Sequence, residues 1–323
     1  MKKTRLLSPI IVSVVFLFAV SMIFSGCNNA EESGDAMITE DNNGETKSEA
    51  NQGDVSESKN EETNGGLLYK GQELVISGST TLLQVSEAWA TEFMKEYGGT
   101  IIVNGGGSGA GIADLINGIS DLANTSRQIK DEELESAKSV GLDIQEYKVL
   151  YDGIAIITSD NVSIDDITIE ELSKIYTGEI INWKDVGGDD SEIVIIARDS
   201  SSGTGEYFLE EVVQLGKTVE DNDYSENALR LQSNAEVVNQ VKENDNAIGY
   251  IGLGYLEESL NVVKVEGIEP SIDTVKDGSY PISRGLYIYS AGELTGIGEA
   301  FIDFILSERG QEIGLEEGFV PLN

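Results

Sequence analysis

The sequence contains no histidine, and its only cysteine is Cys27. The absence of histidine excludes the Ser-His-Asp and Cys-His arrangements by which many hydrolases activate a nucleophile. A lone cysteine cannot build a disulfide framework, and without histidine there is no zinc site of the usual nitrogen and sulfur ligands. Basic residues are also scarce, since 21 Lys and Arg stand against 58 Asp and Glu, a formal net charge of -37. Such a charge argues against binding nucleic acid or docking on anionic lipid.

The start of the chain has the pattern of an export signal. Basic residues near the start precede an apolar run at residues 6–24 that is too short and wrongly flanked for a typical membrane-spanning helix. The tetrapeptide that ends at Cys27 resembles a bacterial lipobox, with Phe24 where leucine is usual. We therefore expect residues 1–26 to be a lipoprotein signal peptide and Cys27 to carry the lipid, palmitate included. The alternative is a plain signal peptide with a chance cysteine.

The next segment is acidic and almost free of large apolar residues. Residues 28–66 consist mainly of Glu, Asp, Asn, Ser and Gly. Such a segment cannot bury enough apolar surface to offset its ordering entropy. We expect residues 27–66 to be a disordered acidic tether that holds a folded domain at the extracytoplasmic face of the cell membrane.

From residue 71 onward, short apolar runs alternate with amphipathic segments. The apolar runs predict strands at residues 74–76, 100–103, 153–158, 193–196, 247–250 and 286–289, and residues 122–127 predict another short strand with its terminal turn. Helical spacing predicts helices at residues 82–97, 112–119, 131–140, 206–215 and 297–306. Capping boxes at Thr168 and Ser233 open two further helices, and Gly178 closes the first of them. This order predicts an α/β fold with a parallel or mixed sheet and helices on both faces.

Polar, glycine-rich turns recur at positions where a predicted strand is followed by a predicted helix. They lie at residues 77–81, 105–111, 124–127 and 198–204. In open α/β sheets, ligands bind beyond the carboxyl ends of the strands, where such turns converge. Arg198 could add a planar, always-charged fork that suits a tetrahedral oxyanion. The alternative for each turn is an ordinary helix cap, but four of them with an arginine favour an oxyanion site.

Other chemistries have weaker support. The glycine turn lacks the Lys-Ser/Thr ending of a P-loop, which argues against a nucleoside triphosphatase. The spacing Gly105-x-Gly107-x-x-Ala110 fits the loose dinucleotide pattern, but an exported protein meets little NAD. No pair of carboxylates has a spacing that marks it for acid–base work.

Several motifs, in order, carry a resemblance to a known family. Residues 167–188, which include the pair Asn182-Trp183, resemble a signature of the bacterial phosphate-binding proteins of ABC transporters. Further matches lie at residues 77–80, 107–111, 198–204 and 307–322, so the resemblance runs from about residue 71 to the end. It implies a two-lobed, type 2 periplasmic-binding-protein (Venus-flytrap) fold, each lobe a mixed sheet flanked by helices. Lobe 1 would comprise residues 71–151 and 284–323, and lobe 2 residues 152–283.

The resemblance also implies the ligand residues. By motif, phosphate would be held by Ser79, Thr80, Ser108, Arg198, Ser202, Gly203 and Thr204, with Thr81 as a weaker assignment. Ser126 and Arg127, in the third turn, are further candidate ligands. Some family members place an aspartate at the position of Ser126, where a carboxylate would repel fully ionised oxyanions such as sulfate. With serine there, the sequence does not explain selection of phosphate over sulfate. Arg127 either binds the anion or pairs with a neighbouring acid, and the alignment of Ser126 favours the pairing.

The function implied is capture of inorganic phosphate and its delivery to a membrane ABC permease, with no chemistry. The resemblance predicts no cofactor and no metal, a monomer, and no nucleic-acid partner. The alternatives are a surface sensor that reports phosphate to a partner, a binder of sulfate or molybdate, and a hydrolase or redox enzyme.

Overall fold

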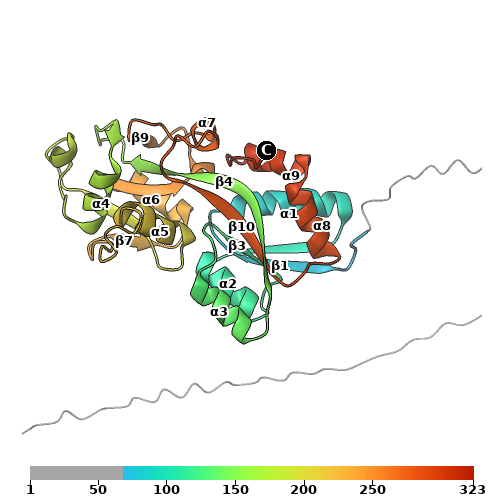
Figure 1. The fold of residues 1–323 in the computed structure, drawn as a ribbon. Helices are drawn as coiled ribbons and strands as arrows, with labels where there is room; N and C mark the ends of the chain where they lie inside the picture. Colours follow the sequence, from blue (N-terminus) through green and yellow to red (C-terminus); the bar gives the residue numbers. More distant parts are fainter. Residues whose placement is uncertain (1–67) are drawn as a thin grey trace, which may run out of the picture. The chain divides into compact units, whose positions relative to one another are not determined.

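Residues 68–323 are described by the computed structural model, and the predicted signal peptide, Cys27 and the tether lie outside the described residues. Helices and strands alternate along most of this part of the chain (Figure 1). The strands are β1 Glu73–Gly78, β2 Thr100–Gly105, β3 Leu122–Thr125, β4 Ile144–Thr158, β5 Asp166–Ile167, β6 Val194–Arg198, β7 Leu229–Leu231, β8 Ala247–Gly252, β9 Asn261–Val265 and β10 Ser283–Ala291. The α-helices are α1 Leu83–Tyr97, α2 Ser108–Ile116, α3 Asp131–Ser139, α4 Ile169–Thr177, α5 Gly203–Phe208, α6 Asn234–Glu243, α7 Ile272–Lys276, α8 Ile297–Leu306 and α9 Glu308–Glu316. Within residues 68–323 no helix has both the length and the hydrophobicity to cross a bilayer.

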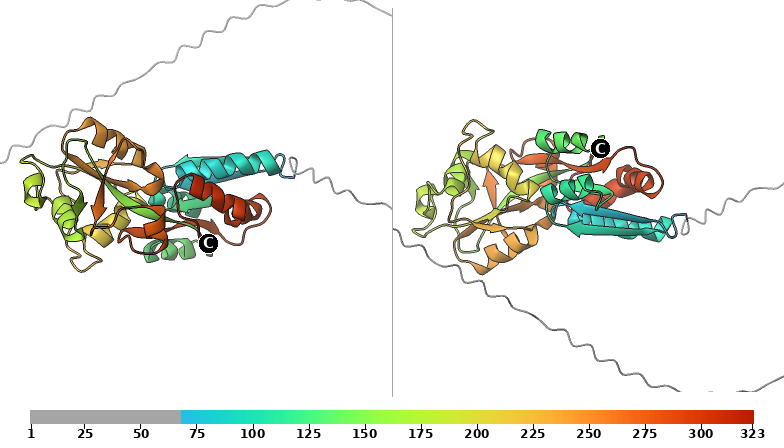
Figure 2. Two further views of the ribbon diagram at one scale, coloured as in Figure 1. Left: turned by 90° about the horizontal axis from the view of Figure 1, so that it is seen from above. Right: turned by 90° about the horizontal axis from the view of Figure 1, so that it is seen from below.

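The strands form a mixed sheet in the order β2-β1-β3-β10-β4-β8-β6-β7, with β9 beside β4 and β5 beside β9. β1 is parallel to β2 and β3, and β6 is parallel to β7 and β8. β10 is antiparallel to both β3 and β4. The long strands β4 and β10 run together in the middle of this order (Figures 1 and 2). They lie between two groups of elements, one built on β1, β2 and β3 and the other on β6, β7 and β8. The predicted α/β architecture of mixed sheets flanked by helices is thus confirmed.

Alternation along the strands explains why helices cover both faces. Successive side chains of a strand point to opposite faces of the sheet. On β4, Ile156 packs in the cluster that contains residues of α4, whereas Ile157 packs against residues of α6. On β10, Ile288 packs in the cluster formed with α1 and α8, and Tyr287 packs with residues of α2. Each part of the sheet therefore buries two apolar faces.

The predicted helix caps are confirmed. The Thr168 hydroxyl accepts from the Glu171 amide and the Glu171 side chain reaches back, as a capping box requires. The same reciprocal pair forms between Ser233 and Glu236. Gly178 ends its helix in the left-handed conformation, with φ of 80°.

Several element boundaries differ from the prediction, among them those of α2, which spans Ser108–Ile116 rather than residues 112–119. The helix expected at residues 206–215 begins at Gly203, because the Ser202 hydroxyl caps it, and it continues from Leu209 to Val213 as a π-helical turn. The strand expected to begin at residue 153 begins at Ile144. Its first half is polar and partly exposed, so no continuous apolar run marks it. The short elements β5, β7, β9 and α7, and the last helix α9, are additional to the prediction.

Candidate functional site

Three of the polar turns lie side by side because the strands that precede them are neighbours. Gly78 is paired with Gly105 in β2 and with Asn124 in β3. The three parallel strands therefore end at one edge of the sheet. Ser79 N donates to Asn124 O at 2.8 Å, and Gly107 N donates to Gly78 O at 2.9 Å. We call residues 77–81, 105–111 and 124–127 the first wall.

The fourth turn, residues 198–204, joins β6 to α5, and we call it the second wall. Asp199 Oδ1 shapes this turn by accepting hydrogen bonds from Ser201 N at 2.9 Å and Ser201 Oγ at 2.7 Å. Ser202 Oγ accepts from Gly205 N at 3.1 Å and caps the helix. A hydroxyl that accepts a backbone N–H still has its own proton to donate. Ser202 can therefore cap α5 and donate to a ligand.

The two walls meet through hydroxyl groups. Thr204 Oγ1 lies 2.8 Å from Thr81 Oγ1 and 3.5 Å from Ser126 Oγ. Ser126 Oγ in turn lies 3.3 Å from Ser108 Oγ. All four residues are buried. We call these side chains the hydroxyl cluster: the structure brings these predicted residues together from four separate turns.

Gly203 permits this approach of the walls. A Cβ atom added to Gly203 would lie 2.3 Å from Ser108 Oγ and 2.9 Å from Ser126 Oγ, so the neighbouring serines would have to shift. Ser79 is buried beside the cluster, and its Oγ accepts from Thr81 N at 3.1 Å. The predicted residues Ser79 and Gly203 therefore shape the site through their positions in the walls.

Arg198 reaches from the second wall to the first. Its side chain belongs to a residue only 1% exposed, and Nη2 donates to Thr80 Oγ1 at 2.8 Å. Nη1 donates to Asn234 Oδ1 at 3.1 Å, and Nε donates to Leu231 O at 3.3 Å. Burial lowers the pKa of Arg198 to about 10, so the guanidinium stays charged at neutral pH.

The charge of Arg198 has no carboxylate partner. In the described part of the chain, no Asp or Glu forms a salt bridge with it. A buried charge is costly unless it is paired or fully hydrogen-bonded. The site therefore suits an anion that would face Arg198 and the hydroxyl cluster together.

Two tyrosines form hydrogen bonds with the backbone of the second wall and of α5. Tyr250 OH accepts from Arg198 N at 3.0 Å, and it lies 2.7 Å from Tyr224 OH. Tyr224 OH donates to Gly205 O at 2.7 Å. The Tyr250 ring stacks on Phe208 with 3.9 Å between ring centroids. Burial raises the pKa of Tyr250 to about 12, so this support is a neutral hydroxyl.

Arg127 lies beside the cluster, with its guanidinium directed to carboxylates. Its Nη1 and Nη2 donate to the two oxygens of Glu133 at 2.9 and 2.7 Å, and its Nε pairs with Glu206. Lys130 Nζ also binds Glu206, at 2.6 Å. Burial lowers the pKa of Arg127, but the two carboxylates outweigh it and the net shift is upward. Because Glu206 belongs to α5, the ion pair between Arg127 and Glu206 links the first wall to the helix that follows the second wall.

We expect Glu206→Gln to weaken ligand binding about 3- to 10-fold, since its charge-assisted contacts with Arg127 and Lys130 become neutral ones. The closed arrangement of the walls would then be less populated, which lowers apparent affinity. Titration calorimetry with phosphate at low and high salt measures the effect, and the variant should be less salt-sensitive than the parent. Glu170→Gln is the control, because Glu170 pairs with Lys174 within α4. Equal affinity of the Glu206 variant and the parent would contradict this role.

Two buried residues of the site are additional to the predicted set. Arg284 Nη2 donates to Thr204 Oγ1 at 2.8 Å and to Asp152 Oδ2 at 2.9 Å. Asn234 Nδ2 donates to Thr81 Oγ1 at 3.3 Å. The signal in the sequence is an arginine two residues before the apolar run at residues 286–289, at the predicted boundary between lobes.

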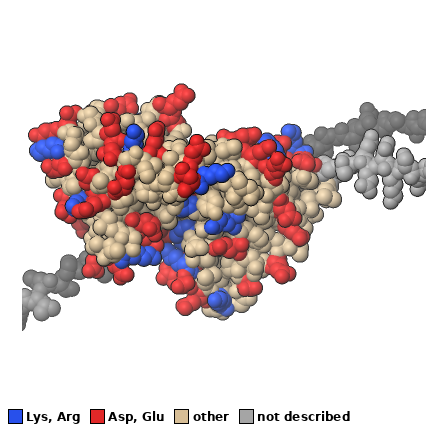
Figure 3. All heavy atoms as spheres, turned by 45° about the horizontal axis from the view of Figure 1, so that its top comes forward, with Lys and Arg blue, Asp and Glu red and all other residues tan. Residues whose placement is uncertain are grey.

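A cavity of about 590 Å³ adjoins the site, and Arg284 forms part of its lining. Its other basic lining residues are Arg127, Lys130 and Lys217. Acidic side chains are spread over the face shown in Figure 3, with basic ones gathered near its middle. Charges on the surface are screened beyond about 8–10 Å at physiological ionic strength, so the acidic surface does not cancel a buried guanidinium. Among residues 68–323 no cluster of three or more acidic or cysteine side chains could hold a metal ion.

Comparison with known proteins gives consistent matches. Residues 43–309 match the PBP superfamily domain. The chain is 35% identical over 254 residues to a phosphate-binding protein PstS of Borreliella burgdorferi, which covers 76% of this chain and 89% of that protein. A solved structure of a candidate phosphate ABC transporter substrate-binding protein with bound phosphate, from Clostridium perfringens, is 37% identical with a TM-score of 0.72, covering 78% of this chain and 100% of that one. An ABC-type phosphate transport receptor from Vibrio cholerae is 30% identical with a TM-score of 0.63, covering 77% and 100%.

Proposed function

Because the chain belongs to the PBP superfamily, among relatives named as phosphate-binding proteins, we propose that it captures inorganic phosphate between two lobes and delivers it to a membrane ABC permease. The observation that carries the proposal is the buried Arg198, which has no carboxylate partner in residues 68–323 and contacts the first wall through Thr80. A tetrahedral oxyanion supplies the missing negative charge and several acceptors at once.

The number of donors is sufficient for tight binding. Hydrogen bonds to a charged group contribute about 1.5–3 kcal/mol each, and micromolar affinity requires about 8 kcal/mol. The donors are the guanidinium of Arg198 and the hydroxyls of Ser79, Thr80, Thr81, Ser108, Ser126, Ser202 and Thr204. Even after the cost of bringing the walls together, we expect micromolar or tighter affinity. The protein would bind phosphate without chemical change.

We place the lobe boundaries at residues 152 and 283, as the sequence predicts. Two features support the placement. Asp152 and Ser283 lie in β4 and β10, the two strands that run together between the groups of elements. The largest buried clusters also divide there, one drawing on residues 154–282 with Val320 and the other on residues 74–150 and 286–319. Opening and closing would then be a hinge motion at these two crossings.

The proposal includes an anchor. Residues 1–26 would be removed as a lipoprotein signal peptide, and Cys27 would carry the lipid at the extracytoplasmic face of the cell membrane. Residues 27–66 would tether the monomeric domain near its permease. These residues lie outside the described part of the chain, and the support is the basic start, the apolar run and the small residues before Cys27.

Titration calorimetry on the purified full chain in detergent tests the binding function. We expect a single site for phosphate with micromolar or lower Kd and no turnover of a generic phosphate ester. Sulfate and molybdate are the matched competitors, since both are tetrahedral oxyanions. Heat with sulfate or molybdate and none with phosphate would refute the ligand and leave the fold intact. Sustained ester hydrolysis by pure protein would refute a purely binding role.

A further inference from the structure

Arg284 and Asp152 face each other where β4 and β10 pass between the two groups of elements. The two residues are paired in the antiparallel register of these strands. Their side chains are 1% and 0% exposed. A buried charge is stable only when it is paired and hydrogen-bonded, so each donor of this guanidinium needs an acceptor.

Asp152 satisfies only part of the guanidinium. Arg284 Nε and Nη2 both donate to Asp152 Oδ2, at 3.2 and 2.9 Å. The other carboxylate oxygen, Asp152 Oδ1, accepts from Leu253 N at 3.0 Å. Arg284 Nη1 is buried and has no hydrogen-bond partner among residues 68–323. Buried polar groups are nearly always partnered, so this donor is available to an acceptor from outside the protein.

The same guanidinium already contacts the hydroxyl cluster. Nη2 donates to Thr204 Oγ1 at 2.8 Å and lies 3.5 Å from Thr81 Oγ1. Arg198 donates to the neighbouring residue of the first wall, Thr80. Two guanidiniums from different strands therefore converge on adjacent threonines, and both walls take part.

The charges at this point do not balance. Arg198 and Arg284 are both buried cations, and Asp152 is the one carboxylate that forms a salt bridge with either of them within the described residues. The pKa of Arg198 is lowered first by burial and further by the positive charge of Arg284. One positive charge is left over among side chains that are almost fully buried. An anion in the hydroxyl cluster neutralises it.

We propose that Arg284 is a second anion-contacting residue, which donates from Nη1 and Nη2 to the oxyanion that Arg198 holds from the other side. The inference rests on the proposed function of this site. Asp152 is a positioning residue: it holds Nε and Nη2 of Arg284 so that Nη1 is directed away from the carboxylate. Because Asp152 is paired with Arg284 and both its oxygens accept hydrogen bonds, it leaves no unpaired carboxylate facing the anion.

The test separates contact with the anion from mere ion pairing. Asp152→Asn breaks the ion pair and keeps the guanidinium, whereas Asp152→Asn with Arg284→Gln removes both charges and keeps a neutral polar pair. We expect the double variant of the full chain to bind phosphate at least about 10-fold more weakly than Asp152→Asn in titration calorimetry. Thermal melting of both variants checks the fold. A purely structural ion pair predicts that the two variants bind phosphate equally, and that result would overturn the inference.

A second measurement avoids dependence on a folded double variant. Nitrogen-detected NMR of the parent chain follows its arginine side chains, and Arg284→Lys assigns the Arg284 signal. We expect phosphate, but not an equal concentration of chloride, to shift the Nη resonances of Arg284. An Arg198 shift without an Arg284 shift would overturn the inference and preserve the proposed function. Absence of any phosphate binding by the parent chain would instead refute the proposed function itself.

Discussion

Replacing Arg198 by alanine is expected to weaken phosphate binding about 100-fold or more. The variant loses at least two hydrogen bonds from a charged group, each contributing about 1.5–3 kcal/mol, and about 1.4 kcal/mol corresponds to a factor of ten in Kd. It also removes the buried charge that contacts Thr80 across the walls. Titration calorimetry with phosphate measures the change.

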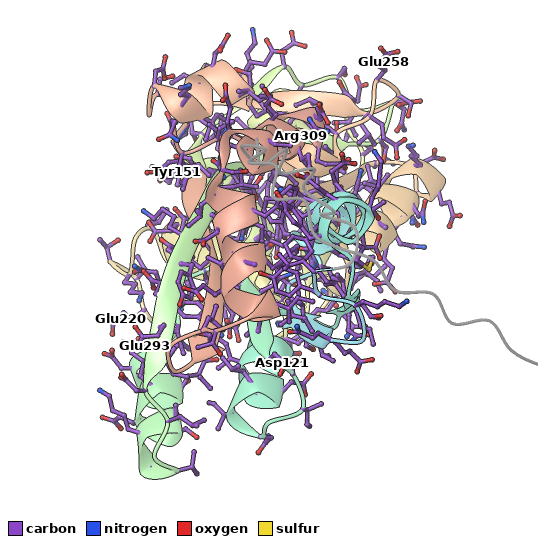
Figure 4. The ribbon with its side chains drawn as sticks, turned by 90° about the vertical axis from the view of Figure 1, so that its right-hand side faces the viewer. Asp121, Tyr151, Glu220, Glu258, Glu293 and Arg309 are labelled. Atoms are coloured by element: carbon purple, nitrogen blue, oxygen red, sulfur yellow. The ribbon has the colours of Figure 1, made fainter. Side chains whose placement is uncertain are left out.

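Two further variants make this result specific. Arg198→Lys keeps the charge but loses the planar fork, so its affinity should fall between those of the parent and the alanine variant. Arg309→Ala is the matched control, because Arg309 lies on α9 (Figure 4) and pairs at the surface with Glu312 and Glu316. Because Arg198→Ala also leaves the Asn234 and Leu231 acceptors unpaired, its melting temperature must be compared with the parent's. A folded Arg198→Ala variant with unchanged phosphate affinity would contradict the site.

Replacing Gly203 by alanine is expected to weaken phosphate binding about 5- to 150-fold, the range that follows from an overpacking cost of about 1–3 kcal/mol. The added methyl group would meet Ser108 Oγ at 2.3 Å and Ser126 Oγ at 2.9 Å, so the walls could not approach as they do. Alanine is a better helix former than glycine, so α5 itself should not be weakened. Titration calorimetry should therefore show weaker phosphate binding. Thermal melting should show no matching fall in the melting temperature.

Gly106→Ala is the control for this substitution. Gly106 lies in the first wall, where an added Cβ would meet only Ala110 Cβ at 3.7 Å, an ordinary contact. We expect its affinity for phosphate to stay within about threefold of the parent's, since surface changes usually alter free energies by about 0.5 kcal/mol or less. If the two glycine variants bound phosphate equally well, contact between the walls would not govern binding.

Local sequence patterns predicted turns of the site and several helix caps. Turn residues and capping boxes act over a few positions, so the turn at residues 77–81 and the caps at Thr168 and Ser233 could be located without a structure. The first half of β4 could not, because its polar and partly exposed residues carry no apolar run. Pairing with β10, more than a hundred residues later, makes it a strand.

The hydroxyls of the site could be predicted, but their partners could not. Thr80 and Arg198 are 118 positions apart, and only the fold brings them within hydrogen-bond distance. The sequence left two roles open for Arg127, and the structure places its guanidinium against Glu133 and Glu206. Arg284 contributes to the site only because β10 returns beside β4, which no local pattern records.

A crystal structure of the chain grown with phosphate tests the central claim most directly. We expect one phosphate whose oxygens lie within hydrogen-bond distance of the Arg198 guanidinium and of hydroxyls from both walls, including Thr80 and Thr204. Phosphate bound away from Arg198, or bound by one wall alone with Arg198 still contacting only protein atoms, would contradict it.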